Sequence, residues 1–169
     1  MLALTALRSA PAMNDGRFLS VNGLRLHAVT AGEGRTILFL HGFPEFWYAW
    51  KEQLREFSRD HQAVAVDMRG YNLSDKPARI EDYTLPLLVA DVKAVLEQVS
   101  PGEKAVLVGH DWGGVIAWIF AALHPATLEK LVIINAPHPE IFARELADNP
   151  QQQQASAYMT FFRSERAEA

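Results

Sequence analysis

The residue in this sequence with the clearest chemical potential is Asp111, which lies between two glycines in the stretch Gly109-His-Asp-Trp-Gly113. An apolar run at 105–108 precedes this stretch, and an apolar helical segment at 115–123 follows it. Small residues at 109 and 113 would let strand and helix approach closely, so that the residue between them projects at the carboxyl end of the strand. This is the pattern of a nucleophile elbow, here with Asp in place of the usual Ser.

A carboxylate at this position has chemistry that a serine lacks. It is ionised near pH 7 without a base, and it can attack strained or halogenated sp³ carbon to form an alkyl ester. Water must then attack the ester carbonyl, and the resulting oxyanion needs fixed N–H donors. In an elbow one donor is the backbone N–H of the next residue, here Trp112, and the other lies in the loop after an earlier strand. The loop His41-Gly-Phe-Pro44 fits that place and offers the N–H of Phe43.

A simpler interpretation of Asp111 is helix capping. Asp is a preferred residue at the start of a helix, where its side chain accepts hydrogen bonds from unpaired N–H groups. The flanking glycines and the matching loop at 41–44 favour the nucleophile over the cap.

The composition narrows the classes of function. The 169 residues carry a net charge of −4 and no cysteine, which argues against nucleic acid as a partner and excludes disulfides, thiolate metal sites and cysteine nucleophiles. The six histidines show no metal-binding spacing, so we expect no metal site. The sequence has no apolar run of membrane-spanning length, and Arg8 interrupts the apolar N-terminus, so a cytoplasmic location is favoured over secretion.

The patterning predicts an α/β protein. We expect strands at 17–21, 24–30, 36–40, 62–67, 105–108 and 131–134, and helices at 46–57, after Thr84 and at 115–123. Asn22-Gly23 predicts a hairpin between the first two strands. Strands alternate with helices after that hairpin, which predicts a mostly parallel sheet flanked by helices. From Pro137 onward the alternation stops, so we expect a different part of the protein there.

Four stretches together resemble the epoxide hydrolases of the α/β-hydrolase fold. They are His41-Gly-Phe-Pro-Glu-Phe-Trp-Tyr-Ala-Trp50, Asp67-Met-Arg-Gly-Tyr71, Gly109-His-Asp-Trp-Gly-Gly114 and Asn135-Ala-Pro-His-Pro139. The resemblance implies a nucleophilic Asp111, with Phe43 and Trp112 as oxyanion-hole donors and a cis peptide before Pro44. It also implies that Tyr158 is a lid tyrosine donating a hydrogen bond to the epoxide oxygen, that the substrate is a small-molecule epoxide, and that no cofactor is needed.

The sequence departs from that resemblance in two places. Asn72 stands where the family has Gly, and Asn is the non-Gly residue that best tolerates positive φ. More consequentially, we find no acid–His pair after Asp111, because His124 and His138 do not stand in the position of a base. His41, Pro44 and His110 border the reactive positions, and we expect them to shape the pocket rather than to activate water.

The missing pair predicts that the chain corresponds to the first half of such an enzyme, truncated at the start of the lid. We expect residues 1–16 to be a disordered extension, 17–136 to be part of the core, and 137–169 to be the start of a helical lid. A partial sheet would leave an open edge and uncovered apolar surface, so we also expect marginal folding or self-association.

Two other functions stay open. A haloalkane dehalogenase also uses an elbow Asp followed by Trp, but that family commonly places Asn where Phe43 stands, to help bind the departing halide. An inactive remnant or interaction module would explain the absent base.

Overall fold

The computed structural model of this chain describes residues 16–162, 164 and 167. Apart from Gly16, the extension expected at residues 1–16 therefore lies outside the described residues. The chain forms two compact units, one ending at Ala136 and the other beginning at Pro137, and each is described by itself.

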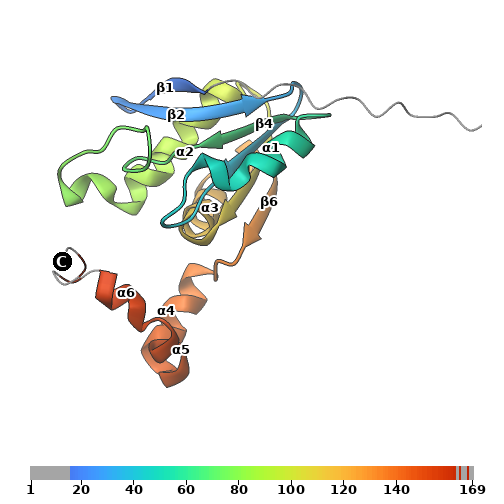
Figure 1. The fold of residues 1–169 in the computed structure, drawn as a ribbon. Helices are drawn as coiled ribbons and strands as arrows, with labels where there is room; N and C mark the ends of the chain where they lie inside the picture. The colour runs from blue at the N-terminus through green and yellow to red at the C-terminus, as the bar shows by residue number, and fades with distance from the viewer. Residues whose placement is uncertain (1–15, 163, 165–166, 168–169) are drawn as a thin grey trace, which may run out of the picture. The chain divides into compact units, whose positions relative to one another are not determined.

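The first unit is built on a six-stranded sheet (Figure 1). Its strands are β1 (Arg17–Val21), β2 (Leu24–Ala31), β3 (Thr36–Leu40), β4 (Gln62–Val66), β5 (Ala105–His110) and β6 (Leu128–Ile134). Their order across the sheet is β1-β2-β4-β3-β5-β6. Strand β2 pairs antiparallel with both β1 and β4, whereas the other three pairs are parallel. The prediction of a mostly parallel sheet after an N-terminal hairpin is thus confirmed.

Helices cover both faces of this sheet (Figure 1). The 3-10 helix η1 (Trp47–Trp50) and helix α1 (Lys51–Phe57) pack on one face, and α2 (Leu85–Val99) and α3 (Asp111–Leu123) pack on the other. Two short 3-10 helices, η2 (Ile80–Tyr83) and η3 (Pro125–Thr127), lie in connections.

The central strands β3, β4 and β5 are largely apolar because both of their faces are buried. Alternate side chains of a strand point to opposite faces, so Leu38 and Leu40 of β3 join the core under α2 and α3, while Ile37 and Phe39 join the core under α1. The sheet is thereby held rigidly between two layers, and its carboxyl ends provide fixed points for the loops that follow.

Several predicted boundaries differ from the structure. The helix expected at 46–57 is divided into η1 and α1. The helix expected at 115–123 begins four residues earlier, at Asp111. Its first turn contains Gly113 and Gly114, which have low helix propensity but are needed there because neighbouring atoms leave no room for a side chain. Strand β6 begins at Leu128 rather than at 131. Thr84 does precede α2, but its side chain makes no capping hydrogen bond.

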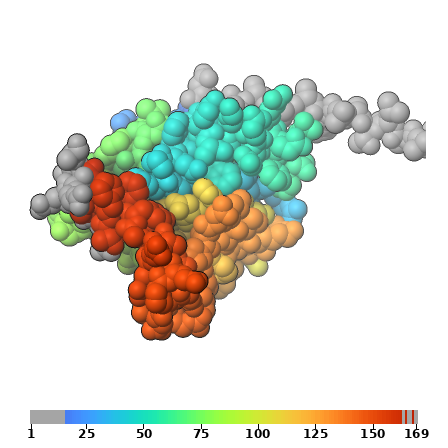
Figure 2. Space-filling model, turned by 60° about the horizontal axis from the view of Figure 1, so that its bottom comes forward, coloured from blue at the N-terminus to red at the C-terminus, as the bar shows by residue number. Residues whose placement is uncertain are grey.

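The second unit is helical. It contains α4 (Pro139–Asp148), α5 (Pro150–Ala155) and α6 (Ala157–Phe162), and the side chain of Asn149 caps α5 by accepting from the N–H groups of Gln151 and Gln152. These helices, orange to red in Figure 2, present a broad exposed surface. Four large apolar side chains on them are exposed: Ile141, Tyr158, Phe161 and Phe162. Among the helices described, none has the length and apolar character needed to cross a membrane.

Candidate active site

Asp111 sits at a sharp turn between β5 and α3. Its φ of 48° lies in the left-handed region, where a non-glycine residue is strained. The helix-capping interpretation does not fit this geometry, because the residue that precedes the first turn of α3 is His110 and no side chain caps it. Strain at a single residue, held by the packing around it, is typical of a functional side chain presented for reaction.

Glycines at 109 and 113 permit the turn. A Cβ on Gly109 would lie 2.5 Å from the carbonyl oxygen of Gly113, and a Cβ on Gly113 would lie 2.5 Å from the carbonyl oxygen of His41. Both contacts are with backbone atoms that cannot move aside. The Gly113 N–H donates to that same His41 oxygen at 3.1 Å, which joins the start of α3 to the end of β3.

The loop after β3 brings a donor to the Asp111 carboxylate. The backbone N–H of Phe43 donates to Asp111 Oδ1 at 3.0 Å. Gly42 makes this approach possible, since a Cβ there would lie 2.7 Å from Asp111 Cβ. The Phe43–Pro44 peptide is cis, as the resemblance implied. The structure therefore brings together two of the predicted site residues, Phe43 and Asp111, from segments 68 positions apart.

Trp112 is the second residue of α3. The N–H groups in the first turn of a helix have no partner within the helix. The N–H of Trp112, in this first turn, is therefore not used by the hydrogen bonds of the helix itself. The ring of Trp112 packs against the core under α2 and α3.

Glu45 is a part of this arrangement that the sequence reasoning did not identify. Its Oε2 accepts from the Gly42 N–H at 2.9 Å and lies 3.0 Å from His110 Nδ1. Partial burial favours the neutral acid, but the Gly42 N–H and His110 outweigh it and hold the pKa of Glu45 below its usual value. One carboxylate thus links the loop that carries Phe43 to the residue that precedes Asp111.

His41 lies behind the site and has no exposed surface. Its Nε2 accepts from the Met68 N–H at 3.1 Å, so Nδ1 carries the proton and faces the Gly42 carbonyl oxygen at 2.8 Å. Burial lowers the pKa of His41, although the Gly42 carbonyl and the carboxylates of Asp67 and Glu45 act in the opposite direction. A buried imidazole with both nitrogens engaged supports the loop that carries Phe43.

The ring of Tyr71 packs against the ring of His41. The two rings meet edge to face with centroids 4.7 Å apart. Burial raises the pKa of Tyr71, and the negative charge of Asp111 raises it further. The phenol therefore remains neutral at physiological pH.

Tyr158 belongs to the second unit. It lies on α6 with 57% of its surface exposed. Its ring meets that of Phe162 edge to face, with the ring centroids 6.2 Å apart. Its role toward Asp111 remains a prediction. No group of three or more metal-ligating side chains occurs among the residues that the structure describes.

Comparison with known proteins agrees with this geometry. The model of the alpha/beta hydrolase fold family matches residues 35–167, and the chain belongs to that family.

Within the family the chain is similar to epoxide hydrolases. Epoxide hydrolase 4 of Mus musculus is 48% identical over 147 residues, which are 86% of this chain and 41% of that protein. Epoxide hydrolase 1 of Caenorhabditis elegans is 41% identical over 154 residues, 90% of this chain and 38% of that protein. A crystal structure of the Bacillus megaterium epoxide hydrolase in complex with an inhibitor superposes with a TM-score of 0.86 at 45% identity, covering 90% of this chain and 53% of that one. The chain thus spans about two fifths of the length of these two curated relatives.

Proposed function

We propose that this chain carries the nucleophilic half of an epoxide hydrolase, with Asp111 as the group that opens the epoxide. The observation that supports this most directly is the contact between the Phe43 N–H and Asp111 Oδ1 at a strained elbow residue. The similarity to named epoxide hydrolases supports the substrate class.

In the first step a carboxylate oxygen of Asp111 attacks a ring carbon of the epoxide. A C–O bond forms and one ring C–O bond breaks. The ring oxygen stays bonded to the other ring carbon and takes a proton from the Tyr158 hydroxyl, which solvent then reprotonates. We assign Tyr158 as the donor of the hydrogen bond to that oxygen. The product of this step is a hydroxyalkyl ester of Asp111.

In the second step water attacks the ester carbonyl carbon. The N–H groups of Phe43 and Trp112 are the proposed donors to the oxyanion, which collapses to release the diol and restore the carboxylate. This step needs a base that takes a proton from the attacking water and returns it to the departing alkoxide. His124 is a poor candidate, because it follows the last residue of α3 and its ring packs on Phe120 with centroids 4.9 Å apart. We therefore propose that the residues of this chain support ester formation far better than ester hydrolysis.

Intact mass spectrometry tests the proposal. Incubation of the chain with a reactive terminal epoxide such as styrene oxide should add the mass of one epoxide, and peptide mapping should place it on Asp111. Asp111→Asn is the matched control, since it keeps the size of the side chain but removes the nucleophile. An adduct that persists in this variant would refute the assignment of Asp111.

The same experiment separates the alternatives. Alkylation of Asp111 by a haloalkane but not by an epoxide would favour a dehalogenase. The side chain of Phe43 argues against that function, because it offers no hydrogen bond to a halide. The absence of any adduct on a folded chain would favour a non-catalytic module.

We also propose that the isolated chain self-associates through β6. This strand lies at the edge of the sheet, and Val132 and Ile134 are 42% and 38% exposed. Unpaired backbone beside exposed apolar side chains is a surface to which another strand can add.

A further inference from the structure

The loop from His41 to Trp47 carries the proposed oxyanion donor Phe43 and has no regular hydrogen-bond ladder to fix it. An oxyanion hole works only when its donors are already in place. The position of the Phe43 N–H therefore depends on what anchors this loop, called here the 41–47 loop, at its two ends.

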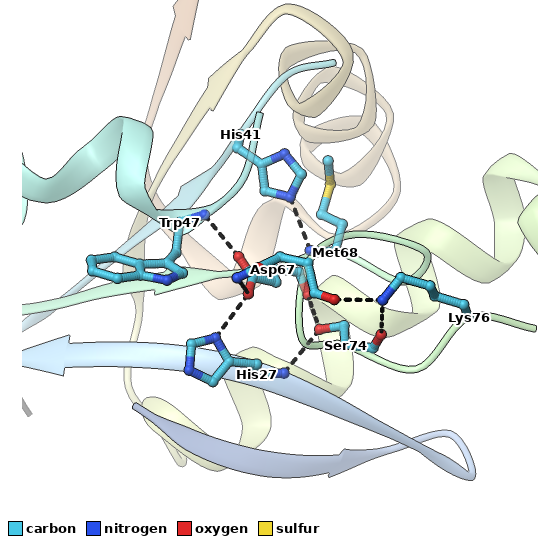
Figure 3. Close-up of polar contacts among 8 residues, drawn as sticks. His27, His41, Trp47, Asp67, Met68, Ser74 and Lys76 are labelled. Atoms are coloured by element: carbon cyan, nitrogen blue, oxygen red, sulfur yellow. Dashed lines mark hydrogen bonds and ion pairs between the residues drawn. The ribbon is translucent and has the colours of Figure 1, made fainter. Parts of the chain in front are cut away.

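The carboxylate of Asp67 anchors the end of the loop. The Trp47 N–H donates to Asp67 Oδ1 at 2.7 Å, at the first residue of η1 (Figure 3). Hydrogen bonds from N–H groups to a carboxylate are among the stronger ones in proteins. This bond fixes the point at which the irregular loop becomes helical.

The residue after Asp67 anchors the start of the loop. The Met68 N–H donates to His41 Nε2 at 3.1 Å (Figure 3). His41 Nδ1 in turn donates to the Gly42 carbonyl oxygen at 2.8 Å. Gly42 is joined by its peptide bond to Phe43. Two consecutive residues that follow β4 therefore hold both ends of the segment that presents the donor.

Asp67 itself is fixed from several sides. It has no exposed surface, and its Oδ2 is 2.8 Å from both His27 Nδ1 and Asn72 Nδ2. The Ser74 hydroxyl donates to the Asp67 carbonyl oxygen at 2.6 Å and accepts from the His27 N–H at 2.9 Å (Figure 3).

Asn72 and Ser74, which both contact Asp67, lie in one turn that the side chain of Lys76 stabilises. Lys76 Nζ donates to the Ser74 carbonyl oxygen at 3.2 Å and also to the carbonyl oxygen of Asn72. Asn72, which departs from the family pattern, thus gives Asp67 a side-chain donor that glycine could not.

We propose that Asp67 is a positioning residue for the oxyanion donor Phe43, acting through the 41–47 loop. The inference rests on the proposed function, because it concerns where that donor is held. A purely structural Asp67 would stabilise the whole first unit evenly. A positioning Asp67 holds the 41–47 loop more strongly than it holds the sheet.

Amide hydrogen exchange measured by NMR on the full 169-residue chain distinguishes the two roles. Asp67→Asn keeps the shape of the side chain but turns one oxygen into an N–H₂ donor, which cannot accept from the groups on that side. The decisive quantity is the exchange of the Phe43 amide relative to that of Leu38 in β3.

Asp91→Asn is the matched control. Asp91 is also buried, at 5% exposure, and its carboxylate binds Arg69 at 2.6 Å on the α2 side of the sheet. Its loss should weaken the fold without acting on Trp47.

In Asp67→Asn we expect the Phe43 amide to exchange at least about tenfold faster relative to Leu38, the factor that corresponds to one lost charged hydrogen bond. In Asp91→Asn this ratio should stay near the wild-type value. An unchanged ratio in Asp67→Asn would overturn the inference.

If Asp67→Asn does not fold, Asn72→Gly provides the test, since glycine adopts the φ of 43° at this position readily. It should raise the Phe43 ratio by a smaller factor, and no rise would equally overturn the inference. The measurement needs no epoxide. If the chain forms no epoxide adduct but Asp67→Asn raises the Phe43 ratio, the hydrolase proposal alone is refuted. If the adduct forms but the ratio does not rise, the positioning role alone is refuted.

Discussion

At His41 the surrounding backbone selects one protonation state. The Met68 N–H requires a lone pair on Nε2, and a protonated imidazole has none to offer. Burial, which lowers the pKa of His41 from its ordinary value of 6.5, favours the same neutral ring in the folded chain.

This lowered pKa predicts how stability depends on pH. Well above pH 6.5 His41 is neutral in both the folded and the unfolded chain, so it adds no pH dependence there. Below pH 6.5 the unfolded chain binds a proton that the folded chain resists, so stability falls with falling pH until the folded pKa is passed. Between pH 7.5 and pH 5.5, urea unfolding should show a larger loss of unfolding free energy in the wild type than in His41→Gln. Equal losses would show that His41 does not carry the effect.

Residue chemistry was predictable where it depends on short spacing. Asp111 and its flanking glycines are adjacent in the sequence, and the 41–44 loop follows an obvious strand. Glu45 was not identified, because its importance comes from His110, which is 65 positions away. The carboxylate of Asp67 likewise shows its contacts only after β2 and β4 have paired.

At the level of elements, the contact between β3, β5 and α3 depends on the absence of side chains. We predict that Gly113→Ala destabilises the first unit by about 3 kcal/mol or more, because its Cβ would meet the His41 and Leu40 carbonyl oxygens. Thermal or urea unfolding measures this loss.

Gly102→Ala provides the comparison. A Cβ at Gly102 meets nothing within 4 Å, although its φ of 75° is unfavourable for alanine. This variant should lose only about 1 kcal/mol from backbone strain. Similar losses in the two variants would mean that crowding at the elbow is not the limiting factor.

Apolar periodicity predicted that these helices and strands exist, but it did not predict where each of them begins and ends. The first four residues of α3 contain two glycines and an aspartate at positive φ, a composition that local propensity assigns to a turn. Packing against the end of β3 makes this segment helical. Tertiary contact overrides propensity most clearly at the place where the candidate chemistry lies.

For the molecule as a whole, the open edge at β6 leads to a prediction about association. The wild-type chain should show a mass above the monomer that rises with concentration in sedimentation velocity. Val132→Lys should reduce this association, because a charge on an edge strand opposes strand addition. Val108, which pairs with Val132 on the neighbouring strand β5, is buried and should not itself be substituted in this test. A wild-type chain that stays monomeric at all concentrations would refute the prediction.

The strand order also has a consequence for how the chain is made. Strand β4 must enter between β2 and β3, but β5 and β6 then join the free side of β3 in the order in which they are synthesised. From β4 onward a chain leaving the ribosome can therefore extend its sheet without reopening a pair already formed. Strand β3 is the template for β5, and β5 is in turn the template for β6.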